Sequence, residues 1–101
     1  MPVFKFQTKI KNYEVQLDWQ GLSYEKNPIT VRVVDNEKIL RILGTINYEK
    51  QQAKEGYKFK DKDLGEIIIK FVRKFLIINE IQVWLNGERL KGNEIIDYSS
   101  I

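Results

Sequence analysis

The feature that most constrains the fold is the alternation of side chains along residues 4–10 and 13–19. In both stretches, apolar residues or threonine occupy every second position, and charged or amide residues fill the positions between them. Successive side chains of a strand point to opposite faces, so a period of two predicts two strands that each bury one face. Lys11-Asn12 is a short connection, and we therefore predict a β-hairpin.

The middle of the chain predicts further strands. Residues 29–35 (ITVRVVD) and 38–48 (KILRILGTINY) are joined by a turn around Asp35-Asn36-Glu37. The second of these strands does not alternate cleanly, and Gly44 within it predicts a bulge or a bend. Residues 49–56 fit a short helix and a hairpin tip equally well. Residues 57–60 alternate again.

We predict a long helix over residues 64–78. Asp63-Leu64-Gly65-Glu66 has the form of a capping box. On a helical projection the apolar side chains that follow cover an arc of about 200°, with Lys70, Arg73 and Lys74 on the remaining arc. A strand would separate Arg73 from the two lysines, so a helix fits better. Packing on one sheet needs a narrower arc; we expect either a sheet that curls around the helix or a second molecule that covers it.

Near the C-terminus, Asn86-Gly87 separates residues 81–85 from residues 88–90. These two residues accept the positive φ angles of a type I′ turn, so the segment predicts a hairpin. Residues 92–101 are expected to be a mobile tail or a final edge strand. Trp19 and Trp84 lie on apolar strand faces, and we expect both in the core.

These elements predict a single α+β domain over residues 1–101. We expect a curved, mainly antiparallel sheet of five or six strands packed on one long helix at about 64–78. The expected order is strand–strand–strand–strand–(strand)–helix–strand–strand. The chain contains no cysteine, so no disulfide supplements its core.

Composition excludes several kinds of chemistry. The absence of both histidine and cysteine removes the usual proton shuttle, the thiolate nucleophile and the commonest zinc, copper and haem ligands. Residues 61–66 open like a calcium loop, but Glu66 and Val72 occupy the positions where that loop requires glycine and glutamate. We expect no catalytic residue, no metal and no cofactor. An enzyme that uses a buried lysine or carboxylate with a shifted pKa is the remaining alternative.

The sequence also predicts a location. The first residues lack the apolar core and cleavage site of a signal peptide. The longest unbroken apolar run, Phe75-Leu76-Ile77-Ile78, is far below the roughly 18 residues of a membrane helix. We therefore expect an intracellular, cytoplasmic protein that does not contact a membrane.

The net charge of +3 is concentrated between Lys50 and Lys62. Five lysines of this segment outnumber its two acidic residues, and Tyr57 and Phe59 alternate with lysines. Cationic side chains bind phosphates and aromatic faces stack on bases, so the segment predicts contact with DNA, RNA or another polyanion. The predicted site comprises Lys50, Lys54, Tyr57, Lys58, Phe59, Lys60, Lys62, Lys70, Arg73 and Lys74.

Two alternatives remain open. In a strand over residues 57–60 the aromatic side chains would point into the core, and the lysines would only keep a sheet edge soluble; we rank this interpretation above nucleic-acid contact. The rival to a polyanion-binding module is a protein-interaction or accessory protein. It would use the excess apolar surface of the helix or an exposed strand edge to bind another protein or a second copy of itself as a homodimer.

Overall fold

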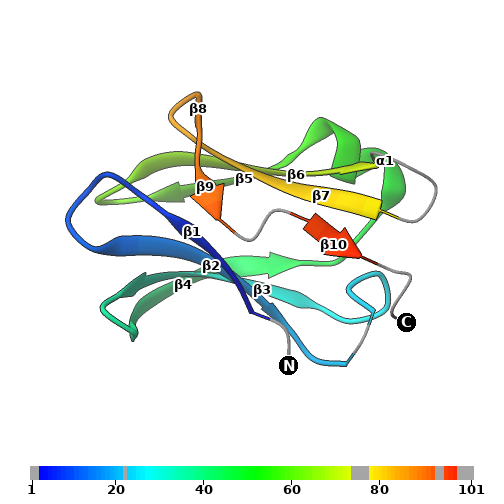
Figure 1. Cartoon of the computed structure of the whole chain (residues 1–101), viewed down its shortest axis with the longest axis horizontal. Coiled ribbons are helices and arrows are strands. Elements are labelled where there is room, and N and C mark those ends of the chain that lie inside the picture. Colours follow the sequence, from blue (N-terminus) through cyan, green and yellow to red (C-terminus); the bar gives the residue numbers. More distant parts are fainter. Residues whose placement is uncertain (1–2, 22, 74–77, 93–94, 98–101) are drawn as a thin grey trace.

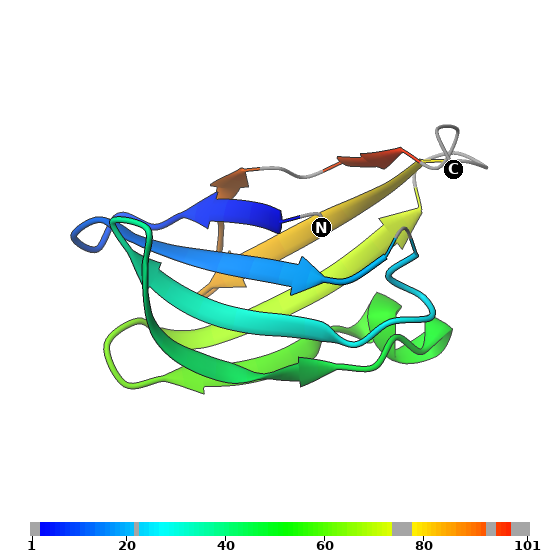
Figure 2. The ribbon, with the colours of Figure 1, turned by 90° about the horizontal axis from the view of Figure 1, so that it is seen from below.

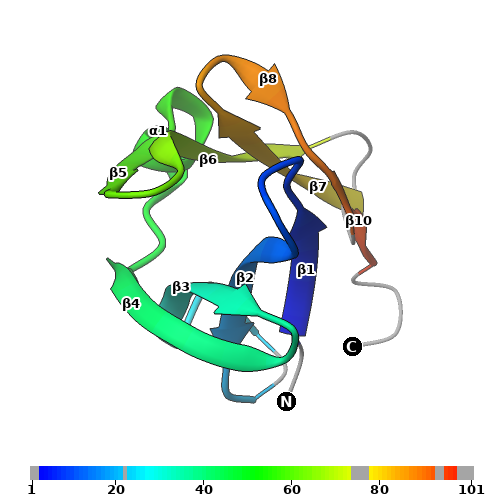
Figure 3. The same cartoon turned by 90° about the vertical axis from the view of Figure 1, so that its left-hand side faces the viewer.

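The structure is a computed structural model that describes residues 3–21, 23–73, 78–92 and 95–97. It is mostly β-structure, with 63% strand and 7% helical residues. Two antiparallel sheets face each other (Figure 1 and Figure 3). The predicted α+β class is therefore wrong, because the only helix among the described residues is a short one.

The first sheet has the strand order β4-β3-β2-β1-β9. β1 (Val3–Gln7) and β2 (Tyr13–Trp19) form the hairpin that the alternation predicts. β3 (Ile29–Asp35) matches its predicted bounds, and β4 (Lys38–Ile46) ends two residues earlier than predicted. The β3–β4 register shifts twice and leaves Leu40 and Leu43 without a partner on β3. These two bulges explain why β4 does not alternate cleanly, and they confirm the irregularity that Gly44 predicts.

A short helix, α1 (Lys50–Glu55), connects the two sheets. For residues 49–56 the structure thus selects the helix over the hairpin tip. The Glu49 carboxylate caps α1, since it accepts hydrogen bonds from the amides of Gln51 (3.0 Å) and Gln52 (2.7 Å). The side chain of Ala53 is buried in the core.

The second sheet has the order β10-β7-β6-β5. Its strands are β5 (Tyr57–Asp61), β6 (Gly65–Arg73), β7 (Ile78–Leu85) and β10 (Ile95–Asp97). The Asn86-Gly87 turn leads from β7 into β8 (Glu88–Arg89), which pairs with β7 and confirms the predicted hairpin. β9 (Lys91–Gly92) then crosses to the first sheet and pairs with β1.

The helix predicted over residues 64–78 is wrong. Most of it is β6; residues 74–77 lie outside the described residues, and β7 begins at Ile78. Ile67, Ile69 and Phe71 are buried and alternate with less buried residues, as in a strand. The pattern resembles a helix because β6 has strand neighbours on both sides, so its outer face also holds the half-buried Ile68 and Val72. Branched side chains of this kind favour strands.

The capping box predicted at Asp63-Leu64-Gly65-Glu66 is wrong too, because this segment forms the end of the turn that leads from β5 into β6 and the first two residues of β6. The side chain of Asp61, and not that of Asp63, accepts hydrogen bonds from the amides of Asp63 (3.0 Å) and Leu64 (2.9 Å). The turn leads into β6 through Gly65, whose φ is +104°. The sequence signal for a helix start was therefore an acidic side chain that closes a β-turn.

The core lies between the sheets and consists of the inward residues of both. Trp19 is buried there and stacks on Phe4 with 5.0 Å between ring centroids. Trp84 is only partly buried, because it alternates with the buried Val83 and Leu85 and lies on the outer face of β7. Its predicted core position is wrong. A radius of gyration of 12.9 Å fits one domain of this length.

Of the C-terminal segment, residues 95–97 form the edge strand β10, as one of the two alternatives predicts. The connections gather at the two ends of the sandwich (Figure 2). α1 and the loop between β2 and β3 lie at one end. The β1–β2, β3–β4 and β5–β6 turns lie at the other.

Candidate functional site

A basic hollow is lined by residues of α1, β6 and the loop between β2 and β3. α1 and this loop lie at the same end of the sandwich (Figure 2). The volume of the hollow is about 360 Å³. Lys50 and Lys54 are one turn apart on α1, so they share a side of the helix, and Arg73 is the last residue of β6. The hollow is lined by Glu25, Tyr48, Lys50, Lys54, Phe71 and Arg73.

A second hollow, of about 190 Å³, continues this site. Glu25 and Tyr48 line both hollows, and Lys26 adds a fourth cation in the second hollow. Asn27, Pro28 and Asn47 complete the lining. We call the two hollows together the end groove. Tyr48 and at least one cation line each hollow, and Glu25 is the only carboxylate among the described residues that line the groove.

Tyr48 is held by an aromatic cluster. Tyr24 and Phe71 stack almost in parallel, with 5.2 Å between centroids. The Tyr48 ring packs perpendicular to both, at 4.9 Å from Tyr24 and 5.5 Å from Phe71. Burial and the charge of Glu25 raise the pKa of the Tyr48 hydroxyl, and Arg73 partly opposes this. Tyr48 therefore presents a neutral ring and a hydroxyl donor at physiological pH.

Contacts at both ends fix α1. Its six residues would be a marginal helix in isolation. The Glu49 amide donates to the Tyr57 hydroxyl (2.9 Å), and the Gly56 amide closes the last turn on the Gln52 carbonyl (2.8 Å). The capping hydrogen bonds from the Gln52 and Gln51 amides lower the pKa of the Glu49 carboxyl. The backbone that presents Lys50 and Lys54 is thus well anchored.

The predicted basic residues do not form one face. Lys50, Lys54 and Arg73 come together in the end groove. The structure places the other described ones elsewhere. Lys58 and Lys60 alternate with the inward residues of β5, Lys70 alternates with those of β6, and Lys62 lies in the β5–β6 turn. Lys74 lies outside the described residues.

The two predicted aromatic residues pack against the core. Tyr57 and Phe59 are half-buried and contact it, whereas Lys58 and Lys60 between them are exposed. Phe59 fits closely over the bare backbone of Gly44, where an added Cβ would lie 2.9 Å from the ring. The interleaving of aromatic and basic residues in the sequence is therefore not an interleaving on one surface.

Sequence reasoning missed the rest of the end groove. Residues 25–28 and 47–48 belong to connections that contain no recognisable binding motif. Glu25 and Tyr48 line the same hollow as Arg73 because β2, β4 and β6 all end at this side of the sandwich. The one available signal was the local excess of lysine that begins at Lys50.

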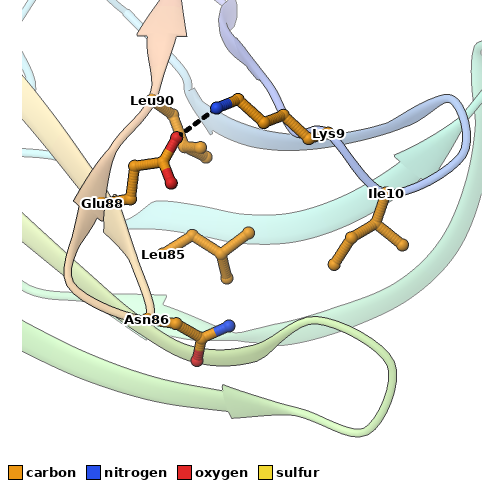
Figure 4. A pocket seen from close by; sticks show the side chains of 6 residues that line it. All are labelled: Lys9, Ile10, Leu85, Asn86, Glu88 and Leu90. Carbon is orange, nitrogen blue, oxygen red and sulfur yellow. Dashed lines mark ion pairs between the residues drawn. The ribbon is translucent and has the colours of Figure 1, made fainter.

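A smaller hollow of about 200 Å³ lies at the opposite end (Figure 4). Ile10, Leu85 and Leu90 give it apolar walls, and the Lys9–Glu88 ion pair (2.7 Å) lies beside it. The hydrogen bond to Glu88 raises the pKa of Lys9. Asn86 donates to the Leu64 carbonyl and accepts from the Glu66 amide. The polar side chains here already bind each other or the backbone. This hollow therefore suits a charged ligand less well than the end groove does.

β4 exposes an apolar strip. Ile39, Leu40 and Ile42 are 51%, 37% and 64% exposed, and β4 is the edge strand of its sheet. Arg41 lies between them but binds Asp61 and Asp63, which links β4 to the second sheet. Large apolar side chains grouped on an edge strand are a feature of interaction surfaces.

The described part of the chain holds no cluster of three or more acidic residues that could bind a metal ion. The same residues include no helix of the length and apolar character needed to cross a bilayer. By its fold and its site, the protein is a small antiparallel β-sandwich with a basic groove at one end. Comparison with known proteins found no matching family model, no matching curated protein and no matching solved structure.

Proposed function

We propose that this chain is a non-enzymatic binding module that binds a nucleic acid or another polyanion in the end groove. The observation that supports this is the convergence of Lys50, Lys54 and Arg73 on one hollow with a tyrosine in its wall. Polyanion binding is driven by neutralisation of phosphates and release of counterions, and such a cluster of cations supplies it. The proposal includes the intracellular location that the sequence predicts.

The lysines of the groove have charge available for a ligand. Lys26, Lys50 and Lys54 form no ion pair with any residue that the structure describes. Arg32 and Arg41, by contrast, are paired with Asp18 and Asp61. Because cations close together repel one another, a bound phosphate would lower the electrostatic energy of the groove.

The test is fluorescence anisotropy of labelled oligonucleotides titrated with the protein at about 50 mM and about 200 mM salt. We expect binding that weakens with salt. The double variant Lys50→Glu/Lys54→Glu should bind more weakly and lower the slope of log K against log salt by about 1 for each phosphate that it no longer binds. Lys38→Glu/Lys91→Glu is the matched control, since both its lysines are exposed and neither lines the groove.

Two results would count against this proposal. Absence of binding at the lower salt concentration would refute it. An equal loss of affinity in the control variant would show that net charge alone attracts the oligonucleotide and that the groove has no specific part in it.

A second candidate function is self-association through the exposed strip of β4. The alternative that used the excess apolar surface of the predicted helix is wrong, because most of that segment is the strand β6. The alternative that uses an exposed strand edge stays a prediction. In a twofold dimer both copies use the same surface patch, so the apolar strip of one copy can pack against the strip of the other. Beside the strip, Arg32, opposite Ile42 on β3, is neutralised by Asp18 (3.1 Å) and also donates to Gln16 (3.1 Å), so its charge does not oppose the contact. The occupant we infer is a second copy of this chain.

Light scattering at micromolar protein concentration tests this second candidate. We expect a dimer, and we expect Ile42→Lys to convert it to a monomer. Thr45→Lys, an exposed position further along β4, should leave the dimer intact. A wild-type protein that remains monomeric under these conditions would exclude self-association.

A further inference from the structure

Tyr48 lines both hollows of the end groove. Lys50, Lys54 and Arg73 line the first hollow with it, and Lys26 lines the second. The Tyr48 ring is only half-buried although it packs against Tyr24 and Phe71. The ring is therefore held in place from within the protein while part of it remains available to a ligand in the groove.

This arrangement has two chemically distinct parts. The cations would bind phosphate groups, which both nucleic acids and other phosphate-containing polyanions supply. An aromatic ring adds little to the binding of phosphate itself, but it stacks on the flat face of a nucleobase. A site that combines cations with an aromatic ring matches a ligand in which every unit carries both a phosphate and a base.

The accessibility of base faces distinguishes single strands from duplexes. In a duplex, each base face is stacked on its neighbours, and a protein reaches only base edges through the grooves. In a single strand, bases can turn outward and stack on a side chain. A hollow of about 360 Å³ is of the size that accepts a small group such as one base with its phosphate.

We propose that the end groove binds single-stranded nucleic acid, with a nucleobase stacked on Tyr48 and the flanking phosphates held by Lys50, Lys54, Arg73 and Lys26. This inference rests on the proposed polyanion-binding function and narrows it to one ligand class. Asn47 lines the groove next to Tyr48, and its side chain makes no hydrogen bond to any described residue. Its amide is therefore available to the edge of the stacked base.

The experiment compares three labelled probes of equal length: an oligothymidylate, an abasic strand with the same phosphates, and a duplex. We expect the oligothymidylate to bind about 5- to 150-fold more tightly than the abasic strand, since stacking contributes about 1–3 kcal/mol per base. The duplex should also bind more weakly than the oligothymidylate.

Two variants test the role of the ring. Tyr48→Leu keeps an apolar side chain against Tyr24 and Phe71 but removes the aromatic face. It should lower the affinity for oligothymidylate much more than the affinity for the abasic strand, so that the preference for bases is lost. Tyr48→Phe keeps the ring and should retain most of the preference. Circular dichroism establishes whether Tyr48→Leu is folded; if it is not, the three-probe comparison on the wild-type protein still decides the question.

The outcomes separate this inference from the function on which it rests. Equal affinity for the oligothymidylate and the abasic strand, or for the oligothymidylate and the duplex, would overturn base stacking and leave polyanion binding standing. Binding of none of the three probes at low salt would overturn both.

Discussion

Replacement of Asp61 by asparagine tests how the two sheets are joined. The Asp61 side chain is fully buried, and its Oδ1 accepts a hydrogen bond from Arg41 Nε. Oδ2 accepts three more: from Arg41 Nη2 (2.9 Å), the Asp63 amide (3.0 Å) and the Leu64 amide (2.9 Å). Asparagine has the same shape but only one acceptor oxygen.

The magnitude follows from this geometry. The asparagine oxygen would take the place of Oδ2, where three donors meet, and its amide nitrogen would then face the Arg41 Nε–H group. One hydrogen bond to a charged group, which contributes about 1.5–3 kcal/mol, would become a contact between two donors. Arg41 would retain Asp63 (2.6 Å) and remains about a quarter exposed, so the loss should stay below the 3–5 kcal/mol of a fully buried broken pair. We expect the free energy of unfolding to fall by about 2–3 kcal/mol.

Urea denaturation monitored by tryptophan fluorescence measures this loss, with an unchanged m value as the sign that only stability has changed. The melting temperature should fall by about 10–20 °C. Asp63→Asn is the matched control, because its carboxylate is exposed and pairs with the same arginine; its loss should not exceed about 1 kcal/mol.

The stability should also depend on pH with a defined sign. The hydrogen bonds from Arg41 hold the pKa of the Asp61 carboxyl below its ordinary value of 3.8. As pH falls, the unfolded chain therefore binds this proton before the folded chain does. The contribution of Asp61 is complete above the unfolded pKa and is lost as pH falls through the folded pKa. The difference between the wild type and Asp61→Asn should be constant at neutral pH and shrink below about pH 4. A loss under about 1 kcal/mol at neutral pH, or a difference that does not change in acid, would refute the reasoning.

The remaining predictions concern the groove and the edge of the first sheet. Glu25→Gln should raise oligonucleotide affinity about two- to fivefold, because it removes the groove's carboxylate; unchanged affinity in the anisotropy assay would place the ligand away from Glu25. Gly92→Ala should destabilise the protein by about 1–3 kcal/mol, because an added Cβ would lie 2.0 Å from the Lys5 carbonyl oxygen. Hydrogen exchange should then show faster exchange along β9 and unchanged exchange in β6, and intact protection of β9 would contradict this.

Local sequence patterns determined several elements correctly. The hairpin over residues 4–19 and the strand over residues 29–35 follow from an alternation that neighbouring residues specify by themselves. The Asn86-Gly87 turn follows from backbone preference, and both of its residues have the positive φ angles that the pattern predicts. In each case the information lies within a few residues, and the tertiary structure only had to accommodate it.

The error at residues 64–78 has a specific physical cause. A helical projection assumes that apolar residues lie on one side, but β6 is a central strand with half-buried residues on its outer face too. Its apolar residues therefore run consecutively, as they would on a helix with a wide apolar face. Branched residues such as Ile67, Ile68 and Ile69 favoured a strand, but their placement depends on the pairing of β6 with β5 and β7.

The sequence by itself determined where charge is concentrated along the chain, and tertiary structure decided which charges meet. Lys50 and Lys54 belong to the segment that the sequence identified, but Lys58 and Lys60 of the same segment lie on the exposed face of β5 and outside the groove. Tyr48 is a close neighbour of Lys50 in the chain, whereas Arg73 joins them because β6 ends at the same side of the sandwich as β4. Periodicity and turn preference are local properties, whereas a groove is made by long-range strand pairing, and that pairing depends on burial across the whole molecule.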